Sequence, residues 1–151
     1  MGERPQLNYD VGELERRLGQ VALFGRIEEA DYSRPRARVR IGPILTDWLP
    51  WGTVKAQNDR SWHPPEVGEQ VLVVAPNGEL NQGCIVCAVH AQDSSDRAPP
   101  ADRPTVDRTE YADGAVIEYD RENGLLRASI PGDAELDAGG RIDAKAGGDA
   151  S

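Results

Sequence analysis

The chain has 151 residues, with 26 acidic and 17 basic side chains and a formal net charge of −9. No apolar run approaches the ~20 residues that a membrane span needs, and no basic segment precedes an apolar one as in a secretory signal. Composition therefore disfavours an integral membrane protein and a conventionally secreted precursor. The acidic balance also disfavours nucleic acid as a partner, because binding phosphates requires clustered Lys and Arg.

The charge is distributed unevenly along the chain. Residues 1–60 have a net charge of +1, residues 61–90 of −3 and residues 91–151 of −7. All three Trp, the only Phe and both Cys precede residue 91. These shifts predict two physically different parts, which fits a small domain with an appendage.

Residues 1–20 are expected to form an N-terminal arm with a short helix. Asp10 is positioned to cap the helix, with Glu13 three residues later at the capping-box spacing. Apolar residues recur at helical spacing on one side of it: Val11, Leu14 and Leu18. A helix of two or three turns is too short to persist alone. It therefore packs on its own domain or docks on a partner, and both alternatives stay open.

Residues 21–90 follow a strand pattern. Residues 21–27 and 37–41 alternate apolar with polar or small positions, and residues 69–75 and 84–89 are nearly continuous apolar runs. Asn77-Gly78 between the two runs favours a hairpin. About five short strands in this length are typical of a small Greek-key barrel such as an OB-fold.

Residues 91–108 are expected to be an extended linker because they are rich in Pro and Asp. In residues 109–151, short segments of period two are separated by turns that contain glycine. Such a ribbon buries too little apolar area to be stable alone, so several chains are expected to wrap together. A disordered acidic tail is the alternative, and the regular apolar alternation argues against it.

The sequence offers no catalytic constellation, and no cofactor or metal is expected. Cys84 and Cys87 match a C-x-x-C motif, but they lie in a strand pattern that places residues three apart on opposite faces, about 10 Å from each other. Zinc would need two more ligands, and His63 and His90 form no recognisable pair with the cysteines. Both cysteines are therefore predicted to be buried, structural residues.

One stripe of the barrel is basic. It consists of Arg34, Arg36, Arg38 and Arg40, of which the last three share one face of an expected strand. Trp48, Trp51 and Trp62 are available for stacking. An OB-fold module that binds nucleic acid or a glycan, with a solubilising acidic tail, is thus one alternative. The more economical interpretation is that the arginines meet acidic groups on a partner or a neighbouring subunit.

Three segments, in this order, resemble the baseplate assembly protein V family. They are IGPILTDWLPW at 41–51, WHPPEVGEQVLV at 62–73 with PNGE at 76–79, and TEY with DG and IEYD within 109–120. Members of this family are the central spikes of contractile-tailed phages and of related tail-like injection particles. The resemblance extends from about Leu14 to Pro131.

The resemblance implies an all-β fold with a short N-terminal helix, an OB-fold barrel at 21–90 and a C-terminal intertwined triple-stranded β-helix at 109–151. It implies a homotrimer with a structural, non-enzymatic role that joins the tail hub to the membrane-piercing tip. It also implies contacts with other baseplate proteins and transient contact with the target cell envelope. The location would be the baseplate of a virion or tail-like particle, after synthesis in the bacterial cytoplasm.

Two sets of residues are expected to carry this role. The trimer core is predicted at Ile117, Tyr119, Leu126, Ile130, Leu136 and Ile142. The hub contact is predicted at Leu14, Leu18, Arg36, Arg38 and Arg40. Some family members end in an apex where a His-x-His pair binds iron. No His follows His90 in this sequence, so we expect a separate tip protein at the C-terminal end instead.

Overall fold

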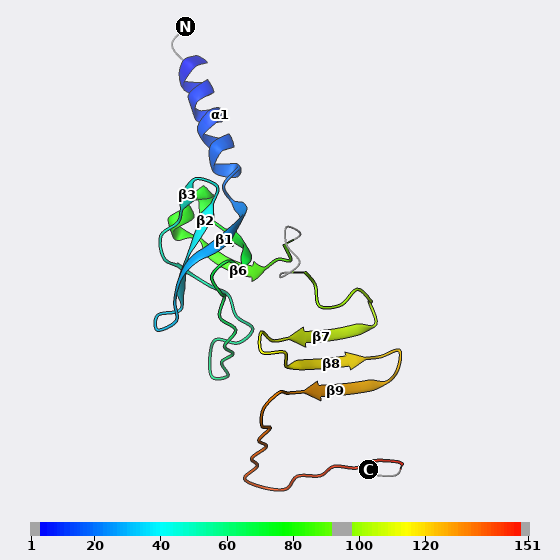
Figure 1. Cartoon of the computed structure of the whole chain (residues 1–151). Coiled ribbons are helices and arrows are strands. Elements are labelled where there is room, and N and C mark those ends of the chain that lie inside the picture. The colour runs from blue at the N-terminus through cyan, green and yellow to red at the C-terminus, as the bar shows by residue number, and fades with distance from the viewer. Residues whose placement is uncertain (1–3, 92–97, 149–151) are drawn as a thin grey trace. The chain divides into compact units, whose positions relative to one another are not determined.

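The structure, a computed structural model, describes residues 4–91 and 98–148 (Figure 1). The chain divides into two compact units, Met1–Ala98 and Pro99–Ser151. The first contains helix α1 and a β-barrel, and the second contains a three-stranded sheet. No helix among the described residues has the length and hydropathy to cross a membrane.

Helix α1 spans Arg4–Leu18, so the prediction that it begins at Asp10 is wrong. Asp10 lies inside the helix, where it cannot act as its cap. The Glu13 carboxylate instead accepts hydrogen bonds from Arg16 at 2.9 and 3.0 Å and from Arg17 at 2.9 Å. Residues three and four apart are neighbours on a helix surface, which explains why Glu13 pairs with the following turn.

Six strands form the barrel, and most are short. They are β1 (Ala22–Asp31), β2 (Arg36–Ile41), β3 (Ile44–Leu45), β4 (Leu49–Pro50), β5 (Gln70–Val74) and β6 (Cys84–Ala88). Their order is β3-β2-β1-β5-β6, and β4 also pairs with β2. A parallel bridge between Trp51 and Ile85, with a 2.7 Å hydrogen bond from Gly52 N to Ile85 O, joins the end of β4 to β6. This contact closes the sheet into an OB-like barrel, so the predicted all-β class is confirmed.

The connection between β5 and β6 is longer than a tight hairpin. Two 3₁₀ turns, η1 (Pro76–Gly78) and η2 (Leu80–Gln82), separate the strands. Asn77 and Gly78 have positive φ angles of 55° and 74°, as the Asn-Gly signal requires. A Cβ at Gly78 would overlap the main chain of Arg17, so the last turn of α1 packs directly on η1.

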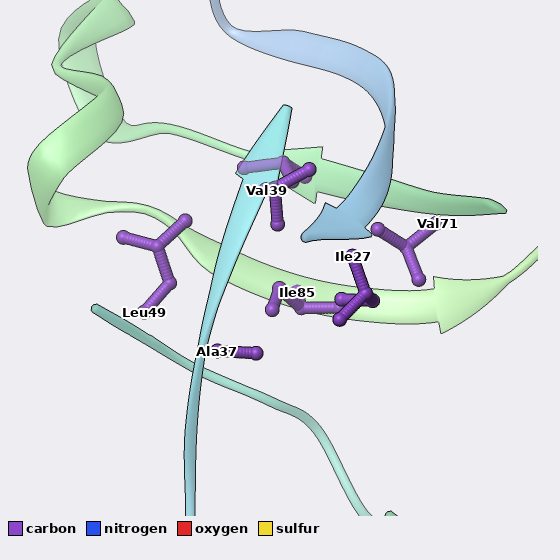
Figure 2. Close-up of a cluster of buried hydrophobic side chains, with 7 residues drawn as sticks. Ile27, Ala37, Val39, Leu49, Val71 and Ile85 are labelled. Carbon is purple, nitrogen blue, oxygen red and sulfur yellow. The ribbon is translucent and has the colours of Figure 1, made fainter. Parts of the chain in front are cut away.

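The barrel core is built from residues that point inward at every second strand position (Figure 2). Its buried members are Ile27, Ala37, Val39, Leu49, Val71, Val73 and Ile85. Burying each of the larger side chains stabilises the fold by about 1.5–3 kcal/mol. The buried Thr46 hydroxyl accepts a 2.9 Å hydrogen bond from Val39 N and donates one of 2.8 Å to Asp47 O, so this polar group is satisfied.

The second unit is an antiparallel sheet in the order β7-β8-β9 (Figure 1). Its strands are β7 (Val106–Glu110), β8 (Val116–Asp120) and β9 (Leu125–Ser129). Strand β7 begins within residues 91–108, the range predicted as linker. Residues 130–148 form no strand, although residues 136–146 alternate as strands do. In the single chain this segment pairs with no strand, and the outer edge of β9 stays open.

Candidate interaction surfaces

One side of the β7–β9 sheet is charged. Arg108, Glu118 and Arg127 lie opposite one another on the three strands. Arg108 donates hydrogen bonds to Glu118 at 2.8 Å and to Glu110 at 2.9 Å, and these carboxylates hold the pKa of Arg108 above its ordinary value. The charges of Arg108 and Glu118 are thus paired within the sheet, where their side chains are 24% and 13% exposed.

Asp120, the last residue of β8, is a buried carboxylate on the charged side of the sheet. Asp120 accepts hydrogen bonds from the Asn123 amide at 2.8 Å and from the Glu122 main-chain N–H at 3.0 Å, and Arg103 lies 3.4 Å away. These interactions, the Asn123 amide first, lower the pKa of Asp120. Asp120 therefore fixes the turn between β8 and β9.

On the other side, β8 and β9 present exposed apolar residues, whereas β7 contributes Asp107 and Thr109. Tyr119 lies opposite Leu126, and Ile117 lies opposite Ala128. The exposed fractions are 49% for Ile117, 50% for Tyr119 and 72% for Leu126. The structure thus brings three of the predicted core residues onto one surface, which we call the apolar sheet face: Ile117, Tyr119, Leu126 and Ala128.

The other three predicted core residues lie beyond β9. Ile130, Leu136 and Ile142 are all exposed and belong to the segment that forms no strand. No strand pairing among the described residues of the single chain brings these three residues next to the apolar sheet face.

The residues predicted to contact a hub lie on two elements of the first unit. Leu14 and Leu18 are exposed on α1. Arg36, Arg38 and Arg40 occupy alternate positions of β2, between the buried Ala37 and Val39.

Two of the arginines expected to meet acidic groups of a partner or a neighbouring subunit pair with carboxylates of their own chain. Arg40 donates to both carboxylate oxygens of Glu28 at 2.6 and 2.9 Å, and it thereby lowers the pKa of Glu28. Arg38 donates to Glu29 at 3.2 Å. Both carboxylates lie on the neighbouring strand β1, so the sequence could not reveal the pairs without the register. Among the described residues, the Arg36 side chain donates one hydrogen bond, to the Pro35 carbonyl at 3.4 Å.

The prediction of buried cysteines is also wrong in part. Cys84 is half-buried and Cys87 is exposed. The register of β5 and β6 shifts between Leu72–Cys87 and Val73–Ile85, which marks a bulge at this point of the sheet. In the described ranges, 4–91 and 98–148, no three His, Cys, Asp or Glu side chains gather as metal ligands would.

Three aromatic side chains form a cluster beside the barrel. The sequence did not predict that they would lie together. Trp51 packs edge-on against Tyr32 and Trp62, with ring centroids 6.3 and 5.7 Å apart. The Tyr32 hydroxyl donates to the Pro65 carbonyl at 3.0 Å. Trp48 does not belong to this cluster. The Arg38 guanidinium lies over the Trp48 ring, with its central carbon 5.9 Å from the ring centroid.

Comparison with known proteins identifies the first unit. Residues 23–90 match the family described as the type VI secretion system/phage-baseplate injector OB domain. The chain belongs to the phage-baseplate spike family. The resemblance to baseplate assembly protein V is thereby confirmed.

This spike family relationship extends beyond the OB domain. The chain is 36% identical over 135 residues to the spike protein of Escherichia phage P2, a match that covers 89% of this chain and 63% of the relative. The chain therefore spans about 63% of the length of the curated relative it matches. Since 89% of the chain is covered, the matched stretch includes most of the Pro99–Ser151 unit with its apolar sheet face.

Proposed function

We propose that the chain is a structural, non-enzymatic component of a phage-type baseplate, namely its central spike. The observation that carries this proposal is the match to the phage P2 spike protein over 89% of the chain. A spike role explains why the chain combines an injector OB domain with a sheet unit that leaves apolar residues uncovered.

The spike is a homotrimer whose copies meet through the apolar sheet face. Ile117, Tyr119 and Leu126 would leave water when sheets of three copies face one another, while the paired Arg108–Glu118 side faces outward. Burying apolar area of this kind contributes about 25 cal/mol per Å². Ile130, Leu136 and Ile142 continue this core in a triple-stranded β-helix, because edges of other copies provide the strand partners that residues 130–148 lack. The number three follows from the family resemblance.

Each end of the spike has its own partner. The first unit contacts the tail hub through Leu14, Leu18 and the β2 arginines, of which Arg36 has no carboxylate partner among the described residues. A separate tip protein caps the C-terminal end. The assembled spike sits in the baseplate of a virion or tail-like particle among other baseplate proteins, after synthesis in the bacterial cytoplasm, and touches the target cell envelope transiently.

Two neighbouring leucines of β9 provide a matched test of the trimer. Leu126 lies opposite Tyr119 on the apolar sheet face, whereas Leu125 lies opposite Asp120 on the charged side. Leu126→Asp should dissociate the trimer, because each copy would bury an unpaired carboxylate at a cost of several kcal/mol. Leu125→Lys, which places a charge of opposite sign across from Asp120, should leave the trimer intact. Mass photometry of the two full-length variants checks this, and a trimer that survives Leu126→Asp would refute the proposed interface.

A further inference from the structure

Helix α1 is attached to the barrel at its last turn. A short link joins Leu18, where α1 ends, to Ala22, where β1 begins. Residues 8–12 and 14–18 of α1 are exposed, so the barrel leaves most of the helix surface uncovered. A helix of this length is marginal on its own, and its order therefore depends on how the last turn is held.

Two main-chain contacts hold this turn. The Val21 carbonyl accepts a 2.8 Å hydrogen bond from Ala75 N. Four residues earlier, the main chain of Arg17 packs on Gly78, where a Cβ would lie 2.8 Å from the Arg17 Cα. Residues 17–21 thus touch residues 75–78 at both ends. A single contact would fix only the position of the helix end, whereas two contacts also fix the direction of the helix.

Charges at this joint add to the attachment. Glu13 accepts hydrogen bonds from Arg16 and raises the pKa of its guanidinium, and the negative charge of Glu79, next to Gly78, raises that pKa further. Arg16 also donates to the Gln20 side chain at 3.2 Å. Exposed ion pairs of this kind contribute little to stability. The close approach of the two main chains is therefore the main constraint at the joint.

The positive φ of Gly78 does not by itself explain the glycine. The preceding residue, Asn77, has a φ of 55°, so asparagine is accepted in this turn. Gly42 has a φ of 56°, and a Cβ there would have no neighbour within 4 Å. Gly78 differs from Gly42 in its neighbour, because a side chain would meet the main chain of Arg17. That main chain cannot retreat without moving α1.

We propose that Gly78 is a positioning residue that fixes the direction of α1 and so presents Leu14 and Leu18 to the tail hub. This inference rests on the proposed spike and its hub contact. An arm held in one direction loses less conformational entropy on binding than one that pivots. At 1.5 Å per residue, Arg4 lies about 20 Å from Arg17, so a small displacement at the joint becomes a large one at the far end of α1.

Two asparagine variants separate the contact with Arg17 from backbone strain. Gly78→Asn and Gly42→Asn both introduce a residue that tolerates positive φ, but only Gly78→Asn places a Cβ against α1. Hydrogen exchange of the full-length variants, followed by mass spectrometry, reports the opening of each element. We expect the amides of α1 to exchange at least about tenfold faster in Gly78→Asn than in Gly42→Asn, with the amides of β2 alike in both.

Two results of this experiment would overturn the positioning role. One is equal exchange of α1 in the two variants. The other is an equal rise in α1 and β2 of Gly78→Asn, because Gly78 would then support the whole barrel rather than the helix.

Particle assembly tests the step from helix direction to hub contact. Particles are assembled with each variant as their spike, and the amount of spike that they retain is measured by immunoblotting. Gly78→Asn should be retained at least about tenfold less than Gly42→Asn, although mass photometry shows the same oligomer for both. Leu14→Asp, which changes the proposed contact itself, should be lost to a similar extent.

The outcomes distinguish this inference from the proposed function. Full retention of Gly78→Asn despite fast exchange in α1 would overturn the presentation of α1 to the hub and leave the spike trimer standing. Full retention of Leu14→Asp would overturn the hub contact through α1. A monomeric unchanged protein would refute the proposed trimer, whatever the exchange of α1.

Discussion

Gly25 shows how closely the strands of the barrel approach one another. A Cβ at this position would lie 2.5 Å from Val39 Cγ1 and 2.7 Å from the Arg40 carbonyl oxygen, much closer than real Cβ atoms come to other atoms. Gly25 thus permits β1 and β2 to pack tightly at the start of the core, where any side chain would force them apart.

Gly25→Ala should therefore destabilise the protein, by about 1–3 kcal/mol as for other overpacked sites. Gly12→Ala is the matched control, because Gly12 lies inside α1 with open space around it, and there alanine should be neutral or stabilise by up to about 1 kcal/mol. Urea unfolding of the two variants measures both effects. Equal stability of both variants would show that the close approach at Gly25 does not constrain the barrel.

Asp31 makes the β1–β2 turn sensitive to acid. Its carboxylate accepts hydrogen bonds from the Ser33 hydroxyl at 2.6 Å and from Arg34 at 3.0 Å, and these lower its pKa from 3.8 to about 2. Because the folded pKa lies below the unfolded one, this stabilisation is complete above about pH 4 and is lost as the pH falls toward 2.

Replacing this carboxylate should remove that part of the pH dependence. Between pH 4 and 2, the free energy of unfolding of Asp31→Asn should fall less steeply than that of the unchanged protein. Denaturant titrations at several pH values provide the comparison. Identical slopes for the two proteins would mean that Asp31 has the same pKa folded and unfolded.

At the scale of single elements, the sequence predicted strands where the alternation of apolar and polar residues reflects burial of every second side chain. The alternation at 37–41 and the apolar run at 69–75 became β2 and β5, since inward and outward positions of a barrel differ in polarity. The start of α1 was missed because Glu13 binds Arg16 and Arg17 rather than the helix N-terminus. The exposure of Cys87 was missed because the outer side of β6 is itself apolar.

The candidate surfaces could be predicted only in part. Ile117, Tyr119 and Leu126 were identifiable from their alternation, which the pairing of β8 with β9 then placed on one side. The pairs Arg40–Glu28 and Arg38–Glu29 depend on a bulge in the β1–β2 register, which no local pattern encodes. Likewise, the cluster of Trp51 with Tyr32 and Trp62 joins residues from separate loops.

The pairing of β2 with β1 bears on the alternative role as a nucleic-acid-binding module. Glu28 and Glu29 neutralise Arg40 and Arg38, so Arg36 is the one arginine of β2 without a carboxylate partner among the described residues. One such charge is too little for binding several phosphates. Tryptophan fluorescence should therefore stay unchanged when a single-stranded oligonucleotide is added at low salt. Saturable quenching that Trp62→Ala abolishes would favour the binding module instead.

In the proposed spike, the whole molecule is one third of an assembly. Its first unit has a closed barrel with a buried core, whereas its second unit exposes the apolar sheet face and an extended segment at 130–148. The net charge of −7 in residues 91–151 then belongs largely to the solvated outside of a needle, since apolar residues alternate with the charged ones. An isolated chain would leave this surface in water at a cost that association removes.

Native mass spectrometry of the full-length chain tests this account most directly. We predict a species of three times 16.4 kDa that persists on dilution, because the copies share one apolar core. A species of 16.4 kDa with the same secondary structure would contradict it, since the apolar sheet face would then be stable in water without a partner.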